Sequence, residues 1–599
     1  MSRLAHKIIS SAGKADDYEI DQSLRFNYSS QSYLARTPNA VGNRKTYTLS
    51  FWAKLCLDQN TYVFNAGTVA GAGIEAFMLS GGWQDIYYGQ SYAPTYFRTS
   101  TVYSQGRDPT AWYHIFHVHD TTQSTAGNRS RTWINGVEFE EYTTELHNSF
   151  SYQDEDEQGL ISTQTLHRIG GADDNSQYMD GNLAEFHYFD GAVKAVTDFG
   201  KTNSDTGQWV PKEYTGGGYG TNGCYLKFSV GTDKFAPWFS SSVEGMYVSH
   251  TAAIDSLAAK SFTQEGWIYP ENDGGGSLDC IWSCGVSQQI YWDYGNSRIV
   301  VYYHDGSSYI FDGVASTGNV KAGQWCHFAV VRNGNTMTVY THGVGGTSAS
   351  SSGTIAASTD NGYIGSYKGE SAAQFKGSVY GFRSTIGTAR YTSNFTPPTS
   401  DLTDDIAWDS SAETGVGFLQ VTNSNSTITD AGQGHTVTKV GSWSSVPFSP
   451  TVDSLGTDHS GQENDWVPFN LLNDGVSKDT PTNNFATFNS ADAGTGNLTW
   501  GNLKWQTTTA HSDACGTFKF PDSGKWYYEI YFVDVNGGYA AIAPIKHTKV
   551  EGGAWDNDVL SIKLSTGEKY HYSGGSWGTD SYGTATSDGE ILQVAVDMD

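Results

Sequence analysis

The stretch Gly218-Tyr219-Gly220-Thr221-Asn222-Gly223 has the G-x-G-x-x-G spacing with which dinucleotide-binding proteins hold a pyrophosphate. Such a site needs a helix that begins at the last glycine, because the helix N-terminus supplies the N–H groups. Residues 224–230 instead alternate polar and apolar side chains, as a β-strand does. The glycines therefore predict a turn that leads into a strand, with Asn222 and Gly223 at positive φ, and no nucleotide site.

Acidic residues do not have the spacing of a glycosidase. An E-x-D-x-x-E segment would place carboxylates on one face of a strand, but the acidic runs at 138–145 and 154–158 do not alternate in this way. The nucleophile motif G-x-S-x-G and the metalloprotease motif H-E-x-x-H are absent. The sequence therefore favours a protein that is not an enzyme. Hydrolysis by carboxylates from distant loops is the alternative.

Histidines and cysteines could supply nitrogen and sulfur ligands to a metal ion. We expect His114, His117 and His119 to share one face of a strand, either as a comb of metal ligands or as a half-solvated face, and the second interpretation is favoured. The six cysteines show no paired metal-binding spacing, since Cys280 and Cys284 stand alone as C-x-x-x-C. Buried free thiols are predicted, as in a protein that folds in a reducing cytoplasm.

Two aromatic segments could bind sugars, because the C–H faces of a sugar ring suit π systems. The predicted carbohydrate-binding residues are Trp83, Tyr87, Tyr88 and Tyr92 in the first segment, and Trp292 and Tyr294, next to Tyr291, in the second. The alternative is that these rings pack in the core or pair across strands, as most aromatic residues of a sandwich do.

Composition restricts the class of protein and the partners. The 599 residues include 69 Gly, 37 Tyr and 18 Trp but only 16% charged residues, which indicates an almost entirely β-protein of several domains. The formal charge of −28 argues against nucleic acid and against an anionic membrane surface as partners. No apolar run is long enough to span a membrane, and residues 1–20 do not resemble a secretory signal.

A long internal repeat organises the chain. Asn-Gly and Asp-Gly pairs at 135–136 and 305–306 predict type I′ hairpins, in which both central residues have positive φ. Short strands at this spacing predict two-sheet β-sandwiches in series. The matching segments are 45–55 with 260–270, 108–120 with 321–334, 131–139 with 336–344, and 167–194 with 362–391.

The repeated segments resemble laminin-G-like, concanavalin-A-type jelly rolls. The resemblance rests on Trp112-Tyr113-His114, on the hairpin at 133–136, on Ile169-Gly170 and on the segment 180–185. The first 230 residues also resemble structural proteins of marine tailed bacteriophages, and residues from 479 onward resemble the SPRY-type sandwich. The fold implied is all-β, with serial concanavalin-A-like sandwiches.

The resemblance implies a division of the chain. In the phage proteins that the chain resembles, a segment like 219–229 is soon followed by segments like 453–470 and 479–489. The second jelly roll, which separates these segments here, therefore looks inserted. The predicted parts are an N-terminal arm at 1–22, a first sandwich at 23–231, an inserted second sandwich at 232–450, a return segment at 451–478 and a SPRY-like sandwich at 479–599. The alternating strand at the end of the sequence leads us to expect that the natural chain continues beyond Asp599.

Laminin-G-like domains often bind Ca²⁺ at the sandwich rim, and this resemblance makes Ca²⁺ a possible cofactor. The predicted metal ligands are Asp173, Asp174 and Asp180, near Asn175. A solvated turn is the alternative, since Asp and Asn are common in turns.

The function implied is that of a non-enzymatic virion surface protein, such as a tail fibre, that binds host surface polysaccharide. Other virion proteins and further copies of the chain, as a trimer, are the expected partners, and the virion, assembled in the host cytoplasm, is the expected location. A purely structural head decoration or tail appendage, and a polysaccharide depolymerase, are the alternatives.

Overall fold

A computed structural model describes residues 18–599 except for the gaps listed at the end of this paragraph. The described residues are almost all β-strands and turns, with one short α-helix, α1 (Ala252–Asp255), which confirms the all-β prediction. No helix within them is both long and apolar enough to cross a membrane. The gaps are 57–60, 69–72, 81–84, 91–95, 101–110, 139–152, 173–176, 230–233, 241–242, 272–277, 370–372, 425, 472–474, 494–495, 500–501, 507–513, 518–522, 534–538, 543–558, 565, 574–575 and 582.

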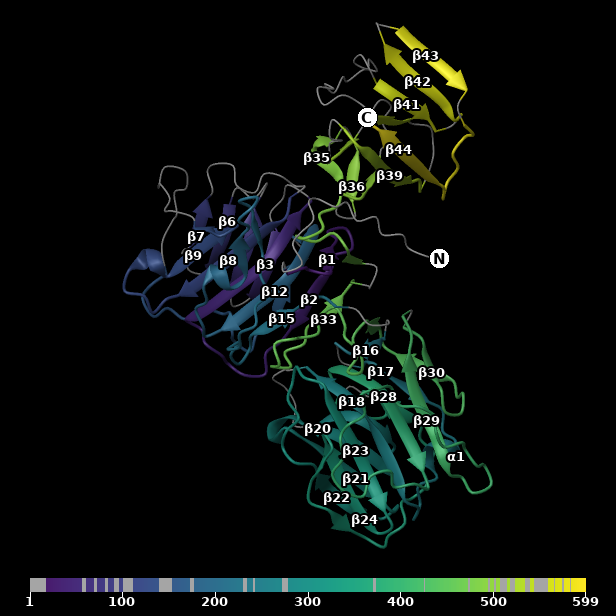
Figure 1. The fold of residues 1–599 in the computed structure, drawn as a ribbon. Coiled ribbons are helices and arrows are strands. Elements are labelled where there is room, and N and C mark those ends of the chain that lie inside the picture. The colour runs from purple at the N-terminus through teal and green to yellow at the C-terminus, as the bar shows by residue number, and fades with distance from the viewer. Residues whose placement is uncertain are drawn as a thin grey trace. The chain divides into compact units, whose positions relative to one another are not determined.

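The chain forms two compact units, Met1–Phe485 and Ala486–Asp599. The first unit contains two sandwiches, each of two antiparallel sheets (Figure 1). The eight-stranded sheet of the first sandwich has the order β10 (Val137–Glu138), β9 (Ser130–Ile134), β8 (Tyr113–Asp120), β3 (Thr46–Leu55), β12 (Gly181–Asp190), β1 (Ser23–Phe26) and β34 (Val476–Ser477), and β15 (Cys224–Leu226) also pairs with β12. Its seven-stranded sheet has the order β33 (Val467–Phe469), β2 (Tyr33–Arg36), β11 (His167–Ile169), β4 (Thr61–Thr68), β5 (Gly73–Ser80), β6 (Asp85–Gln90) and β7 (Tyr96–Ser100).

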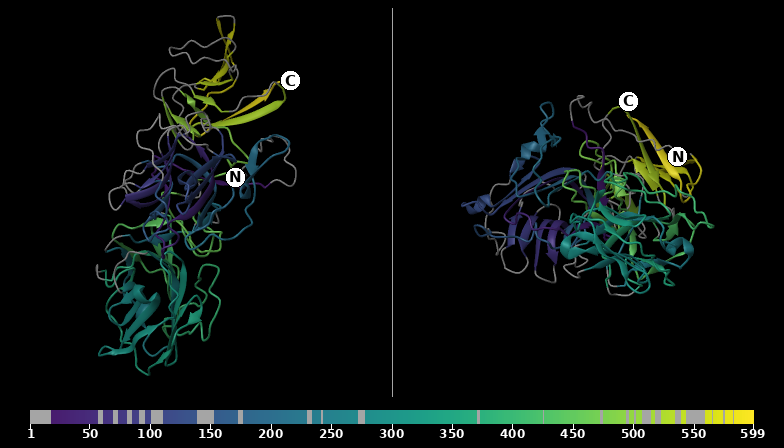
Figure 2. Two further views of the ribbon diagram at one scale, coloured as in Figure 1. Left: turned by 90° about the vertical axis from the view of Figure 1, so that its left-hand side faces the viewer. Right: turned by 90° about the horizontal axis from the view of Figure 1, so that it is seen from below.

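The second sandwich, coloured teal to green in Figures 1 and 2, repeats this plan. Its eight-stranded sheet has the order β25 (Val344–Gly345), β24 (Thr336–Thr341), β23 (Cys326–Asn333), β18 (Phe262–Pro270), β28 (Gly377–Ile386), β29 (Gly415–Thr422) and β30 (Ile428–Asp430), and β26 (Ala349–Ser350) also pairs with β24. Its seven-stranded sheet has the order β22 (Tyr309–Ala315), β21 (Arg298–His304), β20 (Gln288–Asp293), β19 (Asp279–Cys284), β27 (Gly362–Ile364), β17 (Gly245–Val248) and β31 (Val437–Val440).

The repeated segments of the sequence occupy equivalent strands, in the same order, in both sandwiches. The eight-stranded sheets differ at one edge, where β12 is followed by β1 and β34 but β28 is followed by β29 and β30. The central pair β3 and β12 of the first corresponds to β18 and β28 of the second, and β8 corresponds to β23. Period-two alternation gives each strand one apolar face, and these faces meet between the sheets. Phe51 packs edge-on against Phe77 across the first core, at 5.8 Å between ring centroids, and Trp282 stacks on Phe382 across the second, at 4.6 Å.

Residues that follow the second sandwich in the sequence complete the first. Strand β33 extends the seven-stranded sheet beside β2, and β34 extends the eight-stranded sheet beside β1. Leu455, Trp466 and Leu471 belong to the first hydrophobic core. The buried ion pair between Lys54 Nζ and Asp479 Oδ2, 2.8 Å apart, joins β3 to the same returning chain. The second sandwich therefore lies within the sequence of the first, while the boundaries predicted for the parts stay predictions.

The smaller elements connect or extend these sheets. Two further two-stranded sheets are present: the hairpin of β13 (Gly200–Thr202) with β14 (Trp209–Pro211), and the pair of β16 (Ala236–Trp238) with β32 (Ser444–Val446), which come before and after the second sandwich in the sequence. Among the described residues, 3₁₀ turns lie at 126–128, 196–198 and 294–296. In the second unit, β35 (Phe488–Ala493) pairs with β38 (Ala514–Gly516), β36 (Asn497–Thr499) with β37 (Lys504–Gln506), and β39 (Lys525–Tyr531) with β44 (Ile591–Asp597). A four-stranded sheet has the order β40 (Tyr539–Ile542), β41 (Val559–Lys563), β42 (Glu568–Ser573) and β43 (Ser576–Ser581). The prediction that residues 479–599 form a SPRY-like sandwich stays a prediction.

The turn predictions have mixed outcomes. Asn135 and Gly136 both have positive φ, 49° and 79°, which confirms the type I′ hairpin between β9 and β10. Of the second pair only Gly306 has positive φ, because the β21–β22 connection spans four residues, 305–308, and so is no two-residue turn. The G-x-G-x-x-G stretch does lead into a strand, β15.

The prediction of which residues have positive φ in that stretch was wrong. Gly218 and Gly220 have φ of 83° and 76°, and Asn222 and Gly223 do not have positive φ. Gly223 is instead required by close packing, since a Cβ there would lie 2.0 Å from the carbonyl oxygen of Tyr219.

Candidate functional site

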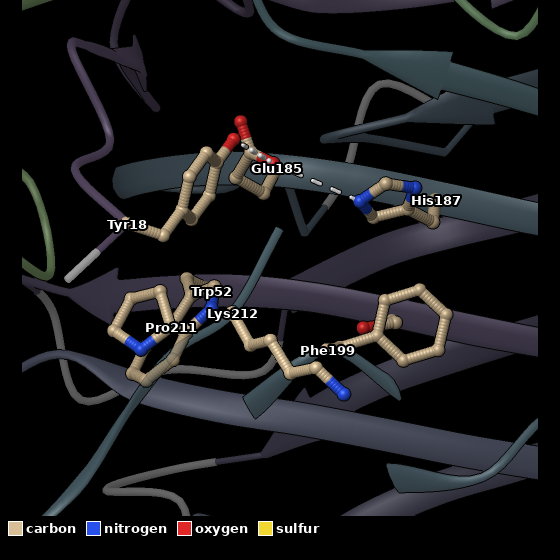
Figure 3. Close-up of a pocket in the computed structure, with 8 residues that line it drawn as sticks. Tyr18, Trp52, Glu185, His187, Phe199, Pro211 and Lys212 are labelled. Atoms are coloured by element: carbon tan, nitrogen blue, oxygen red, sulfur yellow. Dashed lines mark hydrogen bonds and ion pairs between the residues drawn. The ribbon is translucent and has the colours of Figure 1, made fainter. Parts of the chain in front are cut away.

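A small pocket lies on the outer face of the eight-stranded sheet of the first sandwich (Figure 3). Its floor is formed by β3 and β12, because side chains that alternate with core residues point away from the core. The β13–β14 hairpin and the start of the described chain form its walls. The lining residues are Tyr18, Ser50, Trp52, Glu185, His187, Phe199, Pro211 and Lys212.

Glu185 is the central residue of the pocket. It lies in a β-bulge, where the pairing of β12 with β3 shifts between Ala184 and His187, and its φ is 50°. One carboxylate oxygen, Oε2, accepts hydrogen bonds from the hydroxyls of Tyr18, at 2.9 Å, and Tyr225, at 2.6 Å. Tyr18 and His187 approach this carboxylate from opposite sides, with His187 Nε2 3.8 Å from Oε2. A positive φ is unfavourable for glutamate. That Glu185 keeps this conformation and these hydrogen bonds indicates a functional role for its carboxylate.

The surroundings keep Glu185 ionised. Burial alone would raise the pKa of this carboxyl, but the interactions with His187, Tyr225 and Tyr18 outweigh burial and lower the pKa. Burial lowers the pKa of His187, whose Nδ1 lies 2.8 Å from the hydroxyl of Tyr219. The pocket therefore presents one carboxylate surrounded by hydroxyl donors. Most glycoside hydrolases use two carboxyl groups, and Glu185 is the single acidic residue among those that line the pocket.

His114 and Ser50 could be mistaken for a base and its nucleophile, since His114 Nε2 lies 2.9 Å from Ser50 Oγ. The indole N–H of Trp209 donates to His114 Nδ1 at 3.1 Å, so Nδ1 is the acceptor and a neutral His114 carries its proton on Nε2. His114 then donates to Ser50 and does not withdraw its proton. Burial lowers the pKa of His114 to about 3, which keeps the ring neutral at physiological pH.

The prediction that His114, His117 and His119 share a face was wrong. Residues 114 and 117 are separated by an odd number of positions, so a strand points them to opposite faces. His114 packs on Trp52 on the outer face of the sheet. His119 stacks on Tyr47 on the face that points into the core, at 4.8 Å between ring centroids. All three are fully buried, not half-solvated. No group of three or more potential metal ligands occurs within the described residues.

The inward-facing histidines predict an acid-sensitive first sandwich. Burial lowers the pKa of His117 to about 3, below the usual value near 6.5, so its contribution to stability is complete above pH 6.5 and is lost as the pH falls toward 3. Each such histidine adds a slope of about 1.4 kcal/mol per pH unit in that window. We expect His117→Gln to reduce this slope by about that amount, measured by urea unfolding at several values between pH 6.5 and pH 4. Parallel slopes for the two proteins would contradict a buried, neutral His117.

The second sandwich carries a related polar cluster at the equivalent place. Glu265 on β18, fully buried, accepts from Arg383 of β28 at 2.7 Å and from the hydroxyl of Tyr391 at 2.7 Å, and His327 Nε2 lies 3.6 Å away. The bulge of β28 has Gly381, with φ of 64°, where the first sandwich has Glu185. In the second sandwich the carboxylate therefore comes from β18 and is neutralised by Arg383 of β28. We interpret this cluster as a structural ion pair.

Of the residues predicted to bind sugars, some are buried or partly buried in the core, and others lie where the structure describes only the backbone or nothing. Trp292 lies in the core at 1% exposure, so the proposal that it stacks on a sugar is corrected: alternation along β20 points it inward. Tyr294 is partly buried against the same core. Trp83 and Tyr92 lie outside the described residues, and for Tyr87 and Tyr88 the structure gives only their backbone pairing with Met78 and Phe77. Their role in sugar binding stays a prediction.

The neighbour of Trp292 is better placed. Tyr291 lies on the outer face of the seven-stranded sheet of the second sandwich, in a cluster with Tyr302 and Tyr367 that also contacts Tyr309. Sequence reasoning missed these neighbours. Along 298–304, Tyr302 alternates with the core residues Val301 and Tyr303, and this parity, together with Tyr309 in the next strand, was the signal that could have found them.

The predicted calcium ligands are only partly described. Asp173 and Asp174 lie outside the described residues, and Asp180 is buried, with its carbonyl oxygen accepting from the N–H of Cys56 at 3.0 Å. Calcium binding there stays a prediction. The six cysteines form no disulfide and five of them are buried, which confirms the expected thiols.

Comparisons with known proteins give a family match for one segment and several structural similarities. Among solved structures the chain is similar to the mouse laminin alpha1 chain, domains LG4-5 (11% identity, 66% of this chain, 100% of that chain, TM-score 0.21), and to a putative carbohydrate binding protein from Bacteroides ovatus (11%, 69%, 97%, 0.26). A native heptameric SAP-like pentraxin from Limulus polyphemus is also similar (15%, 29%, 78%, 0.21). No curated protein matches the sequence significantly. Residues 243–384 match the laminin-G model of the concanavalin A-like lectin/glucanases superfamily, so the second sandwich carries a laminin-G-type, lectin-like domain.

Proposed function

We propose that the chain is a non-enzymatic virion surface protein, such as a tail fibre, that binds glycans on the surface of the host cell. The observation that carries glycan binding is the match of residues 243–384 to a lectin-type family, within a sandwich whose plan the first sandwich repeats. The sequence resemblance to structural proteins of tailed bacteriophages supports the virion as location, with other virion proteins and two further copies of the chain as partners. A purely structural appendage is the alternative.

Binding without cleavage is favoured by the chemistry of the Glu185 pocket. Its lining includes one carboxylate, which already accepts hydrogen bonds from two tyrosine hydroxyls, and a serine that accepts a hydrogen bond from the neighbouring histidine. His114 is therefore not placed to act as a general base toward Ser50, and Glu185 has no second carboxyl group beside it in the lining of the pocket.

A glycan array with the purified full-length protein tests glycan binding. We expect retention on a subset of polysaccharides, and no increase in reducing ends when those polysaccharides are incubated with the protein. An array on which nothing is bound would favour the purely structural role, and new reducing ends would favour a depolymerase.

A further inference from the structure

The outer face of the seven-stranded sheet in the second sandwich gathers tyrosines from three neighbouring strands. The strands β20, β21 and β22 pair so that Gln289 lies opposite Tyr302, and Tyr302 opposite Asp312. One step along the same strands, Tyr291 lies opposite Val300. Alternation points all these side chains away from the core, in which Ile290, Val301 and Phe311 lie.

Four of these rings, Tyr291, Tyr302, Tyr309 and Tyr367, form what we call the tyrosine patch. Tyr302 contacts Tyr291 and Tyr309 edge-on, at 6.0 Å and 5.7 Å between ring centroids. Tyr367 packs on the same cluster from the loop that follows β27. Tyr291 is the floor of the patch at 8% exposure, and Tyr309 stands at its edge at 42% exposure. The tyrosine patch therefore exposes part of its aromatic surface to solvent on the outer face of the sheet.

Polar groups are held in fixed positions around these rings. The amide oxygen of Gln289 accepts from the hydroxyl of Tyr291 at 3.0 Å, and its amide nitrogen lies 3.4 Å from the hydroxyl of Tyr309. Burial and the negative charge of Asp312 raise the pKa of Tyr302, so its phenol keeps its proton and can donate a hydrogen bond. Asp312 is exposed at the end of this row.

We propose that the tyrosine patch is a binding site for a neutral saccharide, a proposal that rests on the proposed glycan-binding function. Ring faces match the C–H faces of a sugar, and phenol, amide and carboxylate groups beside them match its hydroxyls. The charges favour a neutral ligand over an anionic one. Lys368 is paired with Asp360 at 3.1 Å and Arg298 with Asp293 at 2.9 Å, which leaves Asp312 and the net charge of −28 to repel polyanions.

Affinity gel electrophoresis of the full-length protein tests the site, with the neutral polysaccharides dextran, β-glucan and galactomannan or the anionic polysaccharide alginate in the gel. Tyr302→Ala and Tyr309→Ala are compared with Tyr28→Ala, a matched control in the first sandwich, since Tyr28 and Tyr309 are both 42% exposed. We expect each patch variant to bind about tenfold more weakly to the neutral polysaccharide that retards the wild type. The control should bind like the wild type, and unchanged melting temperatures would show that all variants fold.

Each other outcome overturns a distinct statement. If the wild type is retarded by a neutral polysaccharide and the patch variants are retarded equally, glycan binding stands and the tyrosine patch is not its site. Retardation by alginate alone would overturn the choice of a neutral ligand. If neither these gels nor the glycan array retains the wild type, the proposed function fails, and the assignment of the patch fails with it.

Discussion

Replacing Asp479 with alanine is expected to destabilise the first sandwich by about 3–5 kcal/mol, because it leaves a buried ammonium group without its counter-charge. Lys54 and Asp479 have side-chain exposures of 1% and 6%, and the second oxygen of this carboxylate accepts from the indole of Trp112 at 2.8 Å. Hydrogen exchange measured in increasing urea gives the stability of each sandwich separately, from peptides that cover 46–55 and 262–270. The loss should occur in the first set of peptides and not in the second.

Two further variants separate the charge effect from general damage. Lys54→Met in the Asp479→Ala background is expected to recover much of the loss, since no unpaired charge then remains buried. Asp156→Ala removes the carboxylate of an exposed ion pair in the same sandwich, where Lys45 and Asp156 have exposures of 33% and 62%, and should cost less than about 1 kcal/mol. Equal losses for Asp479→Ala and Asp156→Ala would contradict the conclusion that the returning chain closes the first sandwich.

The second large effect is expected in the other sandwich, on replacement of Glu265 by alanine. Arg383, 5% exposed, would lose its buried partner, at a cost of about 3–5 kcal/mol. Tyr391 would lose its acceptor as well. The segment 388–405, which contributes Tyr391 and the half-exposed Asp405 to the cluster, should exchange its amides faster, in the same urea experiment.

The control for this variant is again an exposed pair of the same sandwich. Asp360→Ala removes the partner of Lys368, with exposures of 43% and 31%, and is expected to change stability little. Arg383→Met combined with Glu265→Met should be more stable than Glu265→Ala, because both charges are gone. An unchanged stability of Glu265→Ala would show that the cluster does not hold the 388–405 segment on the sheet.

The all-β architecture follows from sequence patterns that are local or repeated. The duplication predicted equivalent strands, and the structure places them in identical sheet order. The Asn135-Gly136 hairpin was predictable because positive φ at two consecutive residues is a strong restriction. The strand after the glycine-rich stretch was predictable from alternation alone.

What could not be predicted depends on contacts between distant residues. Nothing local marks Asp479 as the partner of Lys54, since the two are separated by 425 positions. The positive φ of Glu185 arises from a bulge that forms only when β12 pairs with β3. The faces of the histidines and of Trp292 were predictable, by contrast, because parity along a strand settles them, and the error lay in ignoring parity.

Hydrogen exchange of the full-length protein with and without a retained neutral polysaccharide tests the central claim most directly, namely that this is a glycan-binding protein whose site is the tyrosine patch. We expect slower exchange in peptides from β20 to β22, residues 288–315, when the polysaccharide is bound. Protection confined to other parts of the chain, with 288–315 unchanged, would contradict it.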